Sequence, residues 1–85
     1  MHLLATDEFK KKLQELTKKN KTLAIQIDNK IVKLLDNPYL GKPLSHEFAG
    51  KRSIRVGVYI VIYEIKGDKI ILLTIGHRKD VYSNP

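Results

Sequence analysis

The sequence predicts an α+β domain in which an N-terminal strand and a helical hairpin pack on a small antiparallel β-sheet. Two segments before Pro38 space their apolar residues as helices do, and the segments after Leu44 are rich in β-branched and aromatic residues. A Gly67-Asp68 pair separates two of these later runs, as in a two-residue hairpin loop. With 85 residues and 42% hydrophobic content, the chain is expected to form one domain spanning residues 1–85.

The first helix is predicted after a short apolar run at residues 2–5, which is an optional opening strand. Thr6 is placed to cap this helix, because its hydroxyl can accept a hydrogen bond from a free backbone N–H group. The acidic residues Asp7 and Glu8 follow in the first turn, where they favour the positive end of the helix dipole. The helix carries one buried stripe, formed by Phe9, Leu13 and Leu16.

A second helix is predicted after the polar residues 18–21, with Thr22 as its expected cap. It ends near Asp36, because the residue before Pro38 avoids the helical conformation. Its apolar face is formed by Leu23, Ile27, Ile31, Leu34 and Leu35. The short connection predicts an antiparallel hairpin of helices with lysines on its outer faces.

The second half of the chain predicts a β-meander. Residues 58–65 and 70–75 are apolar at nearly every position, which indicates central strands covered on both faces. Residues 51–56 alternate instead, so that Lys51, Ser53 and Arg55 share one side of their strand. A basic row is therefore expected to face outward.

Composition excludes several classes of function. The chain has no cysteine, no apolar run of the ~20 residues that a membrane span needs, and no strong enzyme motif of the phosphate-loop or serine-hydrolase type. His2, His46 and His77 are scattered, so no metal site or cofactor is predicted. A formal charge of +7 favours anionic partners, and the chain is predicted to be cytoplasmic and free of membranes.

A cationic set in the second half points to phosphate chemistry. Arginine offers a planar fork of donors to phosphate, histidine exchanges protons near neutrality, and tyrosine can stack on a base. Tyr59 and Tyr63 are expected to fill the core instead. Exposed strand charges also prevent edge-to-edge aggregation, so these residues alone leave both interpretations open. The set comprises Lys51, Arg52, Arg55, His77, Arg78 and Lys79, with Tyr82 nearby.

Three segments resemble a known family over nearly the whole chain. They are residues 50–65 with their Arg-Val-Gly sequence, the Gly67-Asp68 turn, and the ending Gly76-His77-Arg78-Lys79-Asp80-Val81-Tyr82. Together they resemble the RelE toxins of the RelE/ParE toxin-antitoxin superfamily. The resemblance implies a type II toxin that enters the ribosomal A site and cleaves messenger RNA by 2′-hydroxyl attack, without metal or cofactor. It also implies a RelB-like antitoxin as partner, besides the ribosome and the messenger RNA.

Carried over position by position, the resemblance implies three catalytic residues. Arg78 would stabilise phosphate charge or aid the leaving oxygen, Tyr82 would stack on or orient the nucleotide, and Arg55 would hold the phosphate or assist deprotonation of the 2′-hydroxyl. RNA-binding roles are implied for Lys51, Arg52, His77 and Lys79.

Two departures from the family pattern keep alternatives open. Ile60 follows Tyr59 where most relatives have an arginine, and the further C-terminal helix of many relatives is not expected here after Tyr82. The chain could therefore be a ParE-like protein that inhibits DNA gyrase by binding. A catalytically weakened relative that retains only antitoxin binding is the other alternative.

Overall fold

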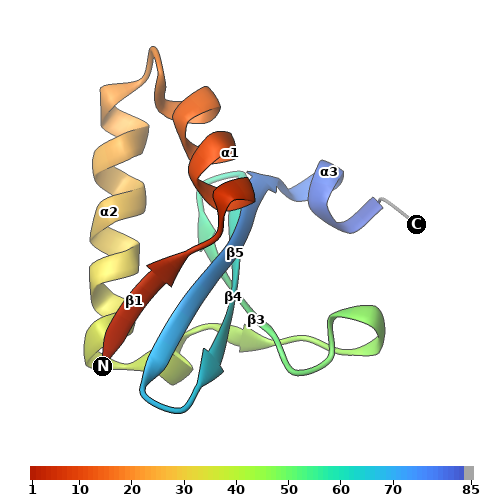
Figure 1. The fold of residues 1–85 in the computed structure, drawn as a ribbon. Coiled ribbons are helices and arrows are strands. Elements are labelled where there is room, and N and C mark those ends of the chain that lie inside the picture. Colours follow the sequence, from red (N-terminus) through yellow and green to blue (C-terminus); the bar gives the residue numbers. More distant parts are fainter. Residues whose placement is uncertain (84–85) are drawn as a thin grey trace.

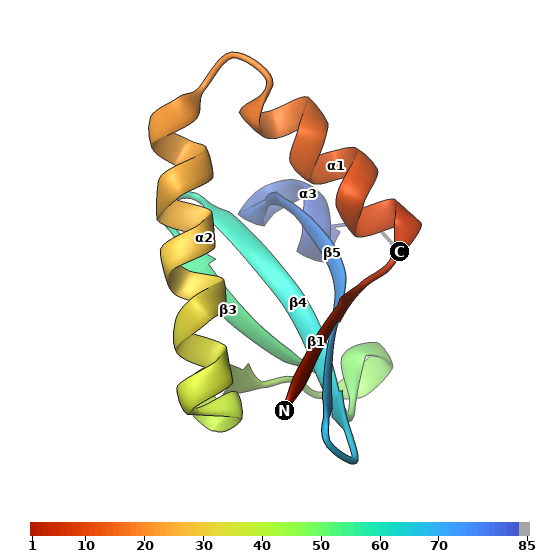
Figure 2. The same ribbon diagram turned by 60° about the vertical axis from the view of Figure 1, so that its left-hand side comes forward.

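Two helices cover one face of a five-stranded sheet in the computed structural model, which describes residues 1–83 (Figures 1 and 2). Helices α1 and α2 span Asp7–Thr17 and Lys21–Asp36, and a six-residue helix α3 spans Arg78–Ser83. The strands are β1 (His2–Ala5), β2 (Lys42–Pro43), β3 (Arg52–Val56), β4 (Tyr59–Lys66) and β5 (Lys69–His77). The predicted α+β class is confirmed, and α3 is an element that the sequence did not predict.

The sheet has the order β1-β5-β4-β3-β2, so β4 and β5 are central as predicted. Strands β3, β4 and β5 form an antiparallel meander, but β1 pairs with β5 in parallel, which makes the sheet mixed. Gly67 begins the β4–β5 turn with a φ of 59°, the left-handed conformation that the predicted hairpin loop requires. The predicted antiparallel sheet thus gains one parallel edge strand.

A β-bulge in β5 decides which residues face the helices. Ile62 pairs with Thr74 and Tyr63 with Leu72, so Leu73 has no partner on β4. Because of this extra residue, the buried core positions of β5 step from Leu72 to Ile75 rather than to Thr74. The bulge therefore shifts the alternation of side chains at the end of β5, and this shift determines the face on which Gly76 lies.

The main core lies between the helices and the sheet. Leu34, Ile27, Val61 and Ile75 are fully buried there, and Leu13 and Leu16 pack against them from α1. Most of the predicted apolar face of α2 is buried, but Leu35 is 40% exposed and does not belong to it. The predicted core role of the strand tyrosines is confirmed, since Tyr63 is fully buried and Tyr59 packs against the cluster.

The two main helices begin at side-chain caps. The Thr6 hydroxyl accepts a hydrogen bond from the Phe9 N–H group at 3.1 Å, as predicted. The cap of α2 is Asn20, whose side-chain oxygen accepts from the Leu23 N–H group at 3.0 Å, so the prediction of Thr22 was wrong. Asn20 offers the same kind of acceptor two residues earlier, so α2 begins about half a turn before the predicted position.

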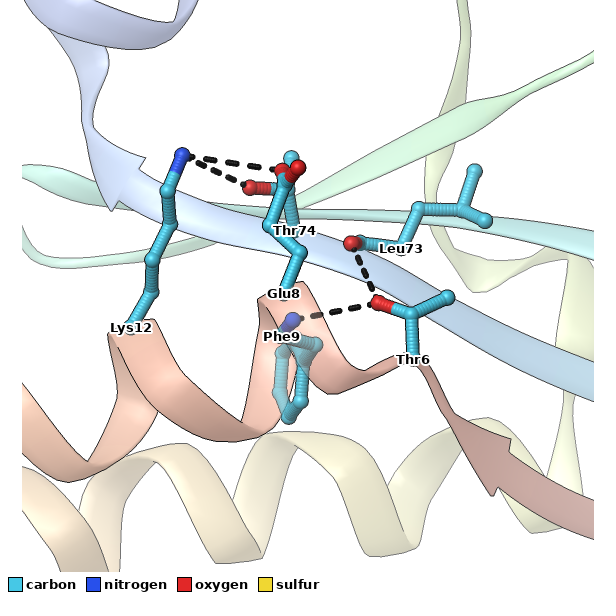
Figure 3. A network of polar contacts seen from close by, with 6 residues as sticks. All are labelled: Thr6, Glu8, Phe9, Lys12, Leu73 and Thr74. Atoms are coloured by element: carbon cyan, nitrogen blue, oxygen red, sulfur yellow. Dashed lines mark hydrogen bonds and ion pairs between the residues drawn. The ribbon is translucent and has the colours of Figure 1, made fainter.

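The start of α1 is fixed to the bulge of β5 (Figure 3). The Thr6 hydroxyl donates to the Leu73 carbonyl oxygen at 2.8 Å, which satisfies an acceptor of the bulged residue. Lys12 Nζ lies 3.6 Å from a Glu8 carboxylate oxygen and 3.3 Å from the Thr74 hydroxyl. The hydrogen bond with Thr74, aided by the charge of Lys12, holds the pKa of Glu8 below its usual value against the opposing effect of burial.

Tyr63 joins the core to the segment that follows α2. Its hydroxyl donates to the Pro38 carbonyl oxygen at 2.7 Å and accepts from the Gly41 N–H group at 2.9 Å. A Cβ atom at Gly41 would meet the Tyr63 hydroxyl at 2.5 Å, so only glycine fits there. Burial raises the pKa of Tyr63 above its usual value. None of α1, α2 and α3, the helices of the described part, has the length and apolar character needed to cross a lipid bilayer.

Candidate active site

A cleft of about 740 Å³ opens where the β3–β4 turn, the end of β5 and helix α3 meet. Its lining includes five of the seven residues that the sequence predicted for the site, namely Arg55, His77, Arg78, Lys79 and Tyr82. Gly57 and Val58 complete the lining, and none of these seven described residues is acidic. The cleft therefore gathers positive charge and an aromatic ring from two separate segments, residues 55–58 and 77–82.

The β3–β4 turn anchors the start of α3. Gly57 adopts a φ of 62° and so permits the tight turn between Val56 and Tyr59. The Arg78 N–H group donates to the Val58 carbonyl oxygen at 2.9 Å, which ties the first residue of α3 to this turn. This link holds the start of α3 beside the β3–β4 turn, and Arg78 and Arg55 both line the cleft.

His77 caps helix α3. Its Nδ1 atom accepts a hydrogen bond from the Lys79 N–H group at 3.2 Å, in the manner of an N-cap side chain. A ring nitrogen that accepts a hydrogen bond cannot donate one, so Nε2 is the ring nitrogen left to contact a ligand. The ring also stands edge-on to Tyr59, with centroids 6.0 Å apart. His77 therefore orients the helix that carries Arg78, Lys79 and Tyr82.

Tyr82 is held from the other side by a residue that the sequence analysis did not identify. The ring of Phe48, in the loop between β2 and β3, packs edge-on against Tyr82 with a centroid separation of 6.1 Å. Tyr82 remains 40% exposed, so one part of its ring is available to a ligand. Phe48 lies outside every segment with strand or helix periodicity, and no local signal connects it to Tyr82.

Ile60 lies on the sheet face that carries Arg55. It pairs with Arg55 on β3 and with Gly76 on β5, and directly paired residues project to the same face. Its side chain is 3% exposed. A Cβ atom at Gly76 would approach Val81 at 3.0 Å, so the glycine allows α3 to pack closely over this position. An apolar residue thus lies beside Arg55 where most relatives are expected to have an arginine.

Lys51 and Arg52 lie away from the cleft. Arg52 Nη1 donates to the carbonyl oxygens of Gly41 at 2.8 Å and Tyr39 at 3.4 Å, and its guanidinium lies 4.9 Å from the centre of the Tyr39 ring. Lys51 lines a separate hollow of about 360 Å³ beside Phe48. The strand alternation grouped Lys51 with Arg55, and Lys51 does line its hollow together with Ile62 of that sheet face, but it does not line the cleft. The Nη1 group of Arg52 is engaged within the protein.

The acidic residue of α3 does not contribute to the cleft. Asp80 lines a different hollow, together with Glu15 and Lys12 of α1. Within residues 1–83, no three histidine or carboxylate side chains gather closely enough to hold a metal ion. Helix α3 therefore separates its residues by charge, with Arg78 and Lys79 toward the cleft and Asp80 toward α1.

The sequence matches a known protein family. A family model described as the ParE toxin of the type II toxin-antitoxin system parDE matches residues 3–82. A segment of 45 residues is 40% identical to Toxin RelG of Mycobacterium tuberculosis. This match spans about half the length of that relative, 52%, and 51% of the present chain.

Solved structures share the fold over almost the whole chain. The YoeB/ParE toxin from Agrobacterium tumefaciens superposes with a TM-score of 0.82 at 18% identity, covering 91% of this chain and 98% of its own. YafQ from E. coli gives 0.79 at 17% identity, with 94% and 96% covered. The toxin-antitoxin complex RelBE2 from Mycobacterium tuberculosis gives 0.75 at 29% identity, with 91% and 96% covered.

Proposed function

The chain belongs to the ParE toxin family of type II toxin-antitoxin systems, within the RelE/ParE superfamily, and from this premise we propose that it is a ribosome-dependent endoribonuclease. It would cleave messenger RNA in the ribosomal A site and so inhibit translation. The observation that carries the proposal is the convergence of Arg55, His77, Arg78, Lys79 and Tyr82 on one cleft without a carboxylate in its described lining. This is the composition expected of a site that binds and cleaves a phosphodiester.

The reaction proposed is transfer within the RNA chain. The ribose 2′-oxygen attacks the adjacent phosphorus, a new P–O bond forms, and the bond to the 5′-oxygen of the next nucleotide breaks. The 2′-hydroxyl loses its proton and the leaving 5′-oxygen gains one, so the products are a cyclic phosphate and a free 5′-hydroxyl. The transition state concentrates negative charge on the phosphate oxygens, which preorganised cations stabilise.

We assign Arg55 and Arg78 to stabilising this negative charge. Arg78 stands at the first turn of α3, where its backbone is fixed to the β3–β4 turn, and its guanidinium would contact the phosphate and the leaving oxygen. Arg55 is exposed on β3 and would hold the phosphate and favour ionisation of the 2′-hydroxyl by hydrogen bonding to its oxygen. Lys79 adds charge beside them.

We assign Tyr82 to orienting a base of the substrate and His77 to positioning helix α3. The half-exposed ring of Tyr82, supported by Phe48, would stack on a base next to the scissile phosphate. His77 uses Nδ1 to cap α3, so only its Nε2–H group can reach a substrate oxygen as a donor. Its proposed role is therefore to position α3 and to donate to the phosphate.

The proposed partners are the ribosome, messenger RNA and an antitoxin in the cytoplasm. Related toxins have been solved in complex with antitoxins, as in the DinJ-YafQ complex from E. coli and the YoeB-YefM complex from Staphylococcus aureus. The charge of +7 favours an acidic antitoxin segment for this chain. We propose that a RelB-like antitoxin covers the cationic cleft and prevents access to RNA.

Primer extension on messenger RNA bound to purified ribosomes tests the proposed activity. The parent protein should cut the messenger only on ribosomes, and Arg78→Ala should cut it about 10² to 10³ times more slowly, as expected for loss of one transition-state contact. Lys18→Ala, which alters an exposed lysine far from the cleft in sequence, is the matched control. Equal cleavage by the parent and Arg78→Ala would overturn the assignment of Arg78.

Two observations favour a second candidate, inhibition of DNA gyrase by binding. The buried Ile60 leaves the strand position beside Arg55 without the expected positive charge, and the matching family model is named for ParE. A supercoiling assay with purified gyrase distinguishes the two candidates. Inhibition of supercoiling together with intact messenger on ribosomes would favour gyrase, whereas unimpaired supercoiling at toxin excess would exclude it.

A further inference from the structure

The cleft continues along the edge of the sheet into two smaller hollows between α2 and β3. One hollow of about 320 Å³ includes Gly57 in its lining, and a second of about 340 Å³ includes Arg55, and both of these residues also line the cleft. Lys30 and Lys33 line both hollows and so connect them. We call this surface, with Lys42 at its far end, the lysine groove.

The lysine groove is positively charged and has no acidic residue among its described lining. Lys30 and Lys33 stand one helical turn apart on α2, and Lys42 faces them from β2. Among the described residues, none of these three lysines has a carboxylate within ion-pair distance. The two acidic residues of α2, Asp28 and Asp36, line neither hollow. Three ammonium groups therefore face the groove, and no carboxylate of the described residues forms an ion pair with them.

The remaining lining suits an extended polar chain. Gln26 and Asn29 place amide donors along the same stripe of α2, while Ile54 and Val56 of β3 belong to the other side of the groove. Lysine binds phosphate as a compact charge on a flexible stem, without the fixed geometry that arginine imposes. Such a surface can hold a phosphate backbone of any sequence, in contrast to the cleft, which is lined by two arginines.

We propose that the lysine groove binds the phosphate backbone of the RNA strand as it leaves the cleft. The inference rests on the proposed endoribonuclease function. If the scissile phosphate is bound by Arg55 and Arg78, the next phosphates of the RNA strand pass beside Arg55. The groove begins at Arg55 and Gly57, so it offers a continuous positively charged path from the reaction site. Lys30, Lys33 and Lys42 would then set affinity for substrates longer than the few nucleotides that fill the cleft.

The test measures binding of the full chain to uncleavable RNA. Fluorescence anisotropy is recorded with a labelled 2′-O-methyl RNA of about 12 nucleotides, and with one of about three nucleotides, over roughly 50 to 200 mM salt. The test variant is Lys30→Gln/Lys33→Gln/Lys42→Gln. The matched control is Lys10→Gln/Lys11→Gln/Lys18→Gln, which removes the same charge from α1 and the turn after it. The triple Lys→Arg variant at the groove positions tests whether charge alone suffices, and thermal melting by circular dichroism verifies the fold of each.

The groove variant should bind the longer RNA on the order of tenfold to a hundredfold more weakly than the parent. Its salt dependence should flatten by about two in the log-log slope, since each lost phosphate contact on a single strand contributes ~0.7. The α1 control and the Lys→Arg variant should bind within about threefold of the parent, and the short RNA should not distinguish the groove variant from the α1 control.

Other results would overturn the inference in distinguishable ways. If the groove variant binds the longer RNA as the α1 control does, while Arg55→Ala and Arg78→Ala lose binding, the groove is not an RNA site and the proposed function stands. If the parent binds neither RNA nor programmed ribosomes, the proposed function and the inference fail together. If the groove variant keeps RNA affinity but loses the antitoxin, the groove is a protein-docking surface instead.

Discussion

The two faces of the sheet differ in what they bury and what they present. On the face covered by α1 and α2, Val61 and Ile75 are fully buried in one continuous cluster. On the opposite face, Ile60 and Ile62 are also buried but lie outside that cluster, and Arg55 remains exposed beside them. The same strands form both faces, so the difference arises only from the side of the sheet to which each side chain projects.

This difference means that stability and chemistry can be altered separately. Substitutions on the helix-covered face remove buried apolar area and should change the free energy of unfolding. Substitutions in the cleft remove exposed charge and should leave that free energy nearly unchanged while altering the reaction. The following variants test that separation.

Leu34→Ala should give the largest loss of stability. Leu34 is fully buried between α2 and the sheet, and truncation of a buried leucine typically costs about 2–5 kcal/mol. Urea unfolding followed by circular dichroism measures the change. Val32→Ala, on the same helix but 57% exposed, should stay within about 0.5 kcal/mol of the parent. Equal losses in the two variants would show that the helix-covered face is not the main source of stability.

Arg78→Ala should have the opposite profile. We expect its activation free energy for cleavage of messenger RNA on ribosomes to rise by about 2.7–4 kcal/mol, which is the cost of losing the proposed transition-state contact. Its free energy of unfolding should shift by less than about 0.5 kcal/mol, since Arg78 is exposed. Parallel urea unfolding and single-turnover cleavage measure the two quantities. A large loss of stability with normal cleavage would contradict the separation of the faces.

Tyr63→Phe should cost about 1–3 kcal/mol in unfolding free energy, because the buried Gly41 N–H group and Pro38 carbonyl oxygen lose their partner. The contribution should also depend on pH. Since burial raises the pKa of Tyr63, the folded state retains the phenol proton more tightly than the unfolded state. The stabilisation is complete below about pH 10, the ordinary tyrosine value, and is lost as the pH rises through the higher folded pKa.

Urea titrations at pH 8 and at alkaline pH measure this dependence. The parent should lose more stability than Tyr63→Phe over the alkaline range, because phenylalanine has no proton to release. Tyr39→Phe, at a position that is 64% exposed, is the matched control and should follow the parent. An alkaline loss that is the same in the parent and Tyr63→Phe would assign it to another group.

His77→Ala should have a small, local effect on stability and a moderate effect on cleavage. Loss of the cap on α3 costs about 0.5–2 kcal/mol locally, which loosens Arg78 and Tyr82 rather than the whole fold. His77→Asn keeps an acceptor for the Lys79 N–H group and should recover most of the lost rate. Cleavage kinetics with separate kcat and KM values test this, and equal defects in the two variants would assign His77 to contact with the substrate instead.

The sequence predicted elements well where periodicity is local. The stripe of α1, the cap at Thr6, the Gly67 turn and the central position of β4 and β5 all follow from spacing within a few residues. Helix α3 was missed because its six residues are too few for a periodic pattern and depend on a tertiary cap from His77. Short elements of this kind are specified by contacts rather than by propensity.

The candidate site could be predicted only in part, because it also depends on contacts between segments that are distant in the sequence. Arg55, Arg78 and Tyr82 were identified by resemblance, and the structure brings them to one cleft. Phe48 could not be identified, because a loop folds it against a residue 34 positions away in the sequence. The bulge at Leu73 has no clear sequence signature either, yet it determines which face the end of β5 presents to the cleft.

The pairing of β1 with β5 has a consequence for the order of synthesis. His2 aligns with Lys69, and the Thr6 hydroxyl binds the Leu73 carbonyl oxygen, so the first strand has no partner until β5 has been made. At translation rates of about 5–20 residues per second, this leaves an interval of several seconds in which the chain has helices but no closed sheet. Arg78 and Tyr82 emerge later still. A nascent chain therefore cannot assemble the cationic cleft until both β5 and α3 have been made.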